Sequence, residues 1–213
     1  LIAHELAHSW SGNLVTNGTW NDFWLNEGFT VYFENRIMES VYGKGYSDML
    51  RKLSYSDLKS EIKEFMNSKP NDTKLSIDLV GRNPDDGVTT IAYDKGFHLL
   101  LVIENLVGRE KFDLFLKNYF KTYKFKSITT SEFVKYLMNN LLNEKQWEMA
   151  DLENWIYGTG LPDNCPKVHP KRFSAVENAI ENILINPEYP FNSSEWSTHE
   201  WLHFLNILGE NEI

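Results

Sequence analysis

Two histidines near the start of the chain have the spacing of a metal site. In HELAH, residues 4–8, His4 and His8 stand four residues apart, so a helix would place both imidazoles on one face. Neutral imidazoles are good zinc ligands, and Glu5 beside them is suited to act as general base on a metal-bound water. The same five residues also fit an ordinary amphipathic helical turn, so the string alone leaves both interpretations open.

A catalytic zinc site needs a third protein ligand and a fourth position open to solvent. Glu27 offers the third ligand, because WLNEGFT at residues 24–30 places it near the start of a second expected helix that packs against the first. Gly28 would leave room for a close helix approach. Glu34 lies seven residues further on the same face. It either orients His8 through a hydrogen bond or is a plain solvated residue.

These motifs resemble the zinc aminopeptidases of the gluzincin group. The finer text is similar to the leukotriene-A4 hydrolase/aminopeptidase branch, in the segments HELAHSWSGNLVTNGTWNDFWLNEGFTVY, IAYDKGFHLL and FKSITTSEF, all within residues 1–162. The resemblance implies one Zn²⁺ held by His4, His8 and Glu27, with Glu5 as general base. It also implies hydrolysis of the first peptide bond in peptides that have a free N-terminus.

The resemblance assigns roles to two further residues. Tyr93, in AYDKG, matches a catalytic tyrosine whose phenol would donate a hydrogen bond to the reaction's oxyanion; without the resemblance it would be a packing aromatic. Asp85, in NPDDG, matches an aspartate used in epoxide opening and near the substrate's amino end, or is a turn aspartate before Gly87. Val88 replaces a second active-site tyrosine, which ranks lipid epoxide hydrolysis below peptide hydrolysis. A third alternative is a zinc-binding fragment without turnover.

A second HExxH string, HEWLH at residues 199–203, is not followed by a segment like the one that contains Glu27. Few acids follow it, and Trp201 and Leu202 have the character of core positions in a short helix. We therefore expect no catalytic zinc there. His98, in the apolar stretch FHLLLVI, is expected to be a core histidine.

The elements that must position these residues read as helices, with few strand signals. Helices are expected over residues 1–12, 25–43, 46–66, 94–108, 110–123, 129–142, 151–162, 174–185 and 198–208. Residues 67–92 form a long loop, which inside a compact domain is usually functional or a lid. The expected fold is mainly α: the helical half of a thermolysin-like zinc metallopeptidase domain (1–162, truncated at its N-terminus), a proline-rich linker (163–173) and the beginning of a C-terminal helical domain (174–213).

The composition of the chain argues against some classes of binding partner and cellular environment. The net charge of −9 argues against a nucleic-acid surface, and no apolar run approaches the ~20 residues of a membrane helix. Cys165 is the single cysteine, so no internal disulfide is possible and we expect a cytoplasmic protein. Because residue 1 already lies in the first motif, we expect a piece of a longer protein. The family's upstream GxMEN strand would lie outside it, leaving an apolar face exposed.

Overall fold

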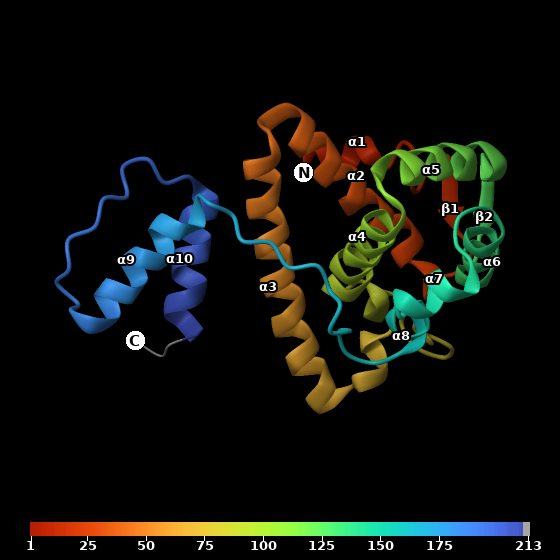
Figure 1. The fold of residues 1–213 in the computed structure, drawn as a ribbon. Helices are drawn as coiled ribbons and strands as arrows, with labels where there is room; N and C mark the ends of the chain where they lie inside the picture. Colours follow the sequence, from red (N-terminus) through yellow and green to blue (C-terminus); the bar gives the residue numbers. More distant parts are fainter. Residues whose placement is uncertain (211–213) are drawn as a thin grey trace. The chain divides into compact units, whose positions relative to one another are not determined.

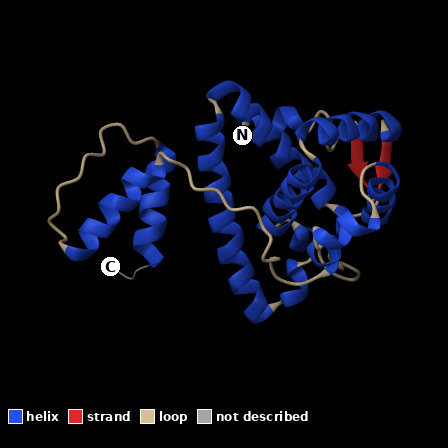
Figure 2. Ribbon diagram, in the orientation of Figure 1, coloured by secondary structure: helices blue, strands red, loops and turns tan. Residues whose placement is uncertain are grey.

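The computed structural model describes residues 1–210, and its helical content of 68% confirms the predicted mainly α class (Figure 2). Two compact units are present: Leu1–Ile37 with Asp57–Pro166, and Met38–Ser56 with Lys167–Ile213. The sequence-based division into 1–162, 163–173 and 174–213 stays a prediction.

The helices are labelled in Figure 1, and longer connections separate them at residues 8–23, 69–95, 158–172 and 186–197. They are α1 (Ile2–Ala7), α2 (Trp24–Tyr42), α3 (Lys44–Ser68), α4 (Gly96–Val107), α5 (Arg109–Tyr123), α6 (Thr130–Asn140), α7 (Glu144–Met149), α8 (Leu152–Tyr157), α9 (Phe173–Ile185) and α10 (Thr198–Glu210). Residues 69–95 contain two 3-10 turns, Pro70–Thr73 and Pro84–Gly87, and a short π-helix, Ile91–Lys95, which runs directly into α4. Helix α7 was not predicted.

Helix α1 is shorter than the sequence pattern predicted. It ends at Ala7, His8 caps it, and a tight turn follows, with Gly12 at a φ of 123°. A side chain other than glycine rarely adopts that conformation. Because α1 ends at Ala7, His8 lies at the start of the turn and not inside a continuous helix.

One short parallel strand pair was missed. Strand β1 (Val15–Asn17) pairs with β2 (Lys126–Ile128), with Val15 opposite Lys126 (red in Figure 2). Beside it, Asp22 accepts a hydrogen bond from the backbone N–H of Thr130, and the Trp24 indole donates to the Thr130 hydroxyl at 3.0 Å. The segment after α1 is therefore held by residues more than a hundred positions later.

The core of the first unit is largely aromatic. Phe29 of α2 lies in contact with Tyr119 of α5 and Phe133 of α6, with ring centroids 5.5 and 5.4 Å apart. All three side chains are buried to at least 98%. Edge-to-face and stacked pairs of this kind contribute beyond their buried area. This packing fixes α2, and with it Glu27, against α5 and α6.

The second unit has its own small core, in which Phe173 packs against Met49 and Leu53. A further cluster, around Val176, Ile180 and Phe204, joins α9 to α10. Among residues 1–210, no helix is long and apolar enough to cross a membrane.

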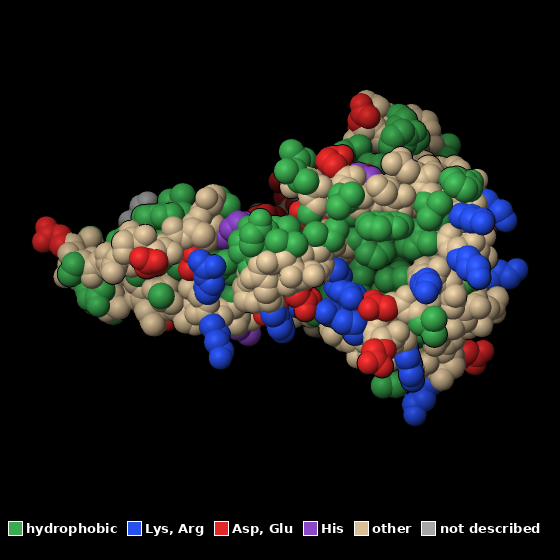
Figure 3. Space-filling view, turned by 90° about the horizontal axis from the view of Figure 1, so that it is seen from above, with side chains coloured by type: hydrophobic (Ala, Val, Ile, Leu, Met, Phe, Trp, Pro, Cys, Tyr) green, Lys and Arg blue, Asp and Glu red, His purple; other side chains and the backbone are tan. Residues whose placement is uncertain are grey.

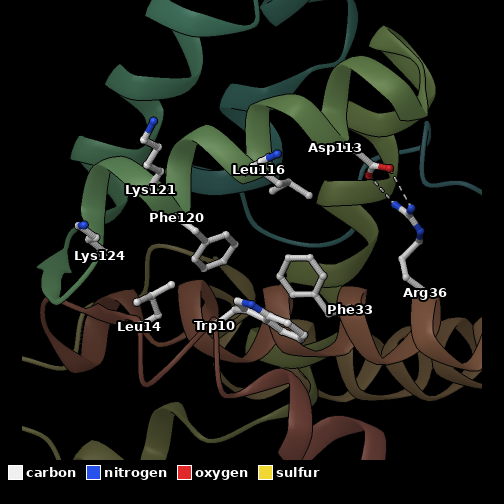
Figure 4. Close-up of a pocket in the computed structure, with 10 residues that line it drawn as sticks. Trp10, Leu14, Phe33, Arg36, Asp113, Leu116, Phe120, Lys121 and Lys124 are labelled. Carbon is white, nitrogen blue, oxygen red and sulfur yellow. Dashed lines mark hydrogen bonds and ion pairs between the residues drawn. The ribbon is translucent and has the colours of Figure 1, made fainter.

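An apolar groove of about 530 Å³ lies beside α5 (Figure 4). Its apolar lining comprises Trp10, Leu14, Phe33, Leu116 and Phe120, and its polar lining comprises Arg36, Asp113, Lys117, Lys121 and Lys124. The last three, exposed on α5 or directly after it, form no ion pair within the described chain. Figure 3 shows apolar side chains gathered in a hollow with cationic side chains on its border. We call this feature the α5 groove.

Candidate metal centre

Three predicted ligands converge in the first unit. His4 lies on α1, His8 caps that helix, and Glu27 lies in the first turn of α2. Their ligand atoms all lie within 4.8 Å of one another. The Nε2 atoms of His4 and His8 lie 3.4 and 3.6 Å from the same oxygen, Oε2 of Glu27.

This arrangement fits a tetrahedral divalent cation on two observations. The Oε2 atom of Glu27 is buried and has no hydrogen-bond partner, a costly state that a cation would relieve. Ligand atoms bound to zinc at ~2.0–2.1 Å in a tetrahedron are about 3.4 Å apart, close to the two separations found here. The residues present therefore fit the expected Zn²⁺.

Both imidazoles are held by their other nitrogen. Nδ1 of His8 lies 2.8 Å from the carbonyl oxygen of Ser11, which only accepts, so Nδ1 carries the proton. Nδ1 of His4 lies 3.1 Å from the carboxylate of Glu34. Each Nε2 lone pair is thus left for a metal, the arrangement that orients histidine ligands.

The prediction for Glu34 was wrong in its partner. Glu34 contacts His4 and not His8. Glu34 lies two turns beyond Glu27 on α2, and at that height α2 faces His4. The carbonyl of Ser11 takes the corresponding place beside His8, because the chain turns back immediately after α1.

The carboxylates also change the protonation of His4. Glu27 first, and then Glu34, raise the pKa of His4 to about 9, against a smaller opposing effect of burial. A histidine must be deprotonated to bind a metal, so these carboxylates make metal binding at His4 dependent on pH.

Tyr93 lies at the edge of the same cluster. Its ring is stacked on His4, with centroids 6.1 Å apart, and meets Phe23 edge-on at 6.0 Å. Burial, followed by the charges of Glu27 and Glu5, raises the pKa of the Tyr93 phenol. The phenol therefore stays protonated near neutral pH and available as a hydrogen-bond donor.

The segment carrying Tyr93 is fixed at both sides. After the π-helix, Gly96 packs so closely on Gly28 that a Cβ on Gly28 would lie 2.8 Å from the Gly96 Cα. Gly28 was predicted to allow a close helix approach; its partner is α4. Lys95, fully buried, donates to the carbonyls of Thr73 and Gly158 at 2.7 and 3.2 Å. Sequence reasoning missed Gly96 and Lys95.

The remaining predicted residues lie outside the cluster of ligand atoms. Glu5 has an exposed side chain on α1, near enough for its charge to act on Tyr93. Asp85 is exposed in the 3-10 turn Pro84–Gly87, where its backbone N–H donates to Asn83. Val88 is also exposed. The structure thus brings His4, His8, Glu27, Glu34 and Tyr93 together, but shows no contact of Asp85 with them.

The second HExxH string is engaged in packing. Glu200 pairs with Arg172 through two hydrogen bonds and caps α10 at Ser197. His203 stacks on Phe173 with centroids 4.1 Å apart, and its Nε2 lies 3.1 Å from the Glu177 carboxylate. His98 is buried on α4, as predicted for a core histidine.

Comparison with known proteins gives one family. The model of the "Peptidase family M1 domain" matches residues 1–155. Leucine aminopeptidase 2 of Lodderomyces elongisporus is 40% identical, over 99% of this chain and 35% of that protein. A leukotriene A-4 hydrolase homolog of Botryotinia fuckeliana is 42% identical, over 76% of this chain and 26% of that protein.

The solved structures that resemble this chain come from the same family as the sequence relatives. Leukotriene A4 hydrolase from Saccharomyces cerevisiae superposes with a TM-score of 0.85 and 33% identity, over 99% of this chain and 36% of that chain. An M1 zinc metallopeptidase from Deinococcus radiodurans gives a TM-score of 0.58 and 25% identity, over 78% and 34%. The chain spans about a third of the length of the relatives it matches.

Proposed function

Because this chain belongs to peptidase family M1, in the branch of the leukotriene-A4 hydrolases and leucine aminopeptidase 2, we propose that the protein is a zinc-dependent aminopeptidase. It would hydrolyse N-terminal peptide bonds in peptides with a free N-terminus. The observation that carries the proposal is the convergence of His4, His8 and Glu27, with the phenol of Tyr93 beside them.

The residues divide the work as follows. His4, His8 and Glu27 would hold one Zn²⁺, which when bound polarises a carbonyl and lowers the pKa of water. Glu5 takes a proton from the attacking water and returns it to the leaving amine. The O–H of Tyr93 donates a hydrogen bond to the oxyanion that develops on the scissile carbonyl. Its raised pKa supports this role, since a phenolate could not donate.

The test is Glu5→Gln in the full-length protein, with L-leucine p-nitroanilide as substrate. Glutamine keeps the shape but accepts no proton, so we expect bound zinc to be unchanged and kcat to fall by about 10²–10⁴-fold. Glu64→Gln, an exposed glutamate on α3, is the matched control and should leave both unchanged. Wild-type turnover by Glu5→Gln would remove the proposed base. Zinc without turnover in the wild type would favour a non-catalytic zinc-binding module.

Hydrolysis of a lipid epoxide is the second candidate. It is supported by the relative named as a leukotriene A-4 hydrolase homolog. The same zinc would be used, with Asp85 in epoxide opening. An assay with a lipid epoxide on wild type and Asp85→Asn separates the two, because peptide hydrolysis does not require that step. The exposed Val88, in place of a tyrosine, keeps this candidate second.

A further inference from the structure

Thr30 lies behind the His8 ligand, in a place that no motif marked. Its side chain is fully buried. The Oγ1 atom lies 3.1 Å from Nδ1 of His8, 2.6 Å from the Ser11 hydroxyl and 3.2 Å from the Ser11 carbonyl. Three groups therefore meet on one threonine hydroxyl.

The hydrogen bonds of this cluster can be assigned from its donors and acceptors. The carbonyl of Ser11 accepts from Nδ1–H of His8 and from the Thr30 hydroxyl. The Ser11 hydroxyl then donates to Oγ1 of Thr30, which also faces Nδ1 of His8. The 2.8 Å contact between Nδ1 of His8 and the Ser11 carbonyl places the proton on Nδ1, because a carbonyl oxygen only accepts, and this leaves Nε2 deprotonated.

Thr30 connects two of the candidate ligands, His8 and Glu27. It lies three residues after Glu27, on the same face of α2. Helix α1 does not itself fix His8, because α1 ends at Ala7. The turn that follows therefore depends on contacts with other parts of the chain. Thr30 binds that turn, at Ser11, and the ring, at Nδ1, to the helix that carries Glu27.

We propose that Thr30 is a positioning residue for the metal centre: its hydroxyl holds Ser11, and the His8 ring that donates to the Ser11 carbonyl, in a fixed orientation relative to Glu27. This rests on the proposed function only in that the cluster binds a divalent cation. Outer partners of metal-bound histidines typically change metal affinity by about 10–100-fold.

The test compares Thr30→Val, Thr30→Ser and wild type in the full-length protein. Valine keeps the shape and removes the hydroxyl, whereas serine keeps the hydroxyl. We expect Thr30→Val to raise the zinc dissociation constant by about 10–100-fold, in competition with a chelator, and Thr30→Ser to stay within about threefold of wild type. The Co²⁺ visible spectrum should shift in Thr30→Val alone.

Thr130→Val is the matched control. Thr130 is also buried, and its hydroxyl accepts from the Trp24 indole, away from the ligands. It should lower thermal stability without changing the zinc dissociation constant, which separates a role at the metal from general loss of a buried hydrogen bond.

Each outcome decides the proposal. Equal zinc affinity and Co²⁺ spectra for Thr30→Val and wild type would overturn it while leaving the proposed function intact. Equal losses in Thr30→Val and Thr130→Val would overturn it as well, since the effect would be one of stability. A wild type that binds neither zinc nor Co²⁺ would refute both this inference and the proposed function.

Discussion

The contact between Gly28 and Gly96 is expected to set the distance between Glu27 and Tyr93. Gly28 follows Glu27 directly on α2, and Gly96 begins α4 just after the π-helix that carries Tyr93. In Gly28→Ala, the new Cβ would lie 2.8 Å from the Cα of Gly96 and 2.9 Å from its carbonyl carbon. Both atoms are backbone, so a helix must shift.

The distance that α2 and α4 must move apart determines how much stability and catalytic rate Gly28→Ala should lose. Relief to an ordinary contact of about 3.5–4.0 Å requires roughly 1 Å of movement between α2 and α4. Overpacking of this kind costs about 1–3 kcal/mol of the free energy of unfolding. A displacement near 1 Å between catalytic groups lowers the rate by about 10²-fold. We expect Gly28→Ala to show both losses, measured by urea unfolding and by hydrolysis of L-leucine p-nitroanilide.

A matched variant separates the two losses. Gly43, between α2 and α3, has a φ of 85°, and a Cβ at this position would meet only open space. Gly43→Ala should be destabilised by about 1 kcal/mol through backbone strain alone, with kcat unchanged. A stable Gly28→Ala with wild-type kcat would refute the idea that this contact spaces the site.

Two further predictions concern charge. Burial lowers the pKa of Lys95 to about 7, so between pH 7 and about 10 the unfolded chain binds more protons and the free energy of unfolding should rise with pH, by up to about 1.4 kcal/mol per unit. The stability advantage of wild type over Lys95→Met, from urea unfolding at pH 7, 8 and 9, should grow accordingly; a constant difference contradicts the burial effect. Separately, the anionic dye anilinonaphthalene sulfonate should bind the α5 groove, and reversing its three lysines to glutamate should weaken binding about tenfold at low salt. The control is the same charge reversal at three other exposed lysines, Lys59, Lys63 and Lys145. An equal loss of dye binding in that control would show that only net charge matters.

Part of the metal cluster could be predicted because part of its information is local. Four-residue spacing brings His4 and His8 to one face, whereas Glu27 was added from its place in WLNEGFT and from the resemblance to the zinc aminopeptidases. The second helix, predicted for residues 25–43, is observed as Trp24–Tyr42, since Gly43 ends it at a positive φ. Whether these side chains bind zinc stays a prediction.

What the sequence did not show depends on long-range contacts. Strands of three residues are too short for an alternating pattern, and β1 and β2 form only because the chain returns after more than a hundred residues. The partner of Glu34 depends on the height at which α2 passes α1, which helical periodicity does not specify. Thr30 carried a weak signal, its spacing of three from Glu27, but nothing in the sequence pointed to Ser11.

The parallel strand pair has a consequence for the order in which the protein can be built. All candidate ligands lie within the first 27 residues of this chain, yet the segment between them is held in place by β2 and by the backbone N–H of Thr130, which donates to Asp22. During synthesis, domains assemble as their segments leave the ribosome. A nascent chain that stops short of residue 126 would thus display both histidines and the glutamate without the frame that holds them at bonding distance. We therefore expect metal capture to be a late event in biogenesis, following the emergence of α6.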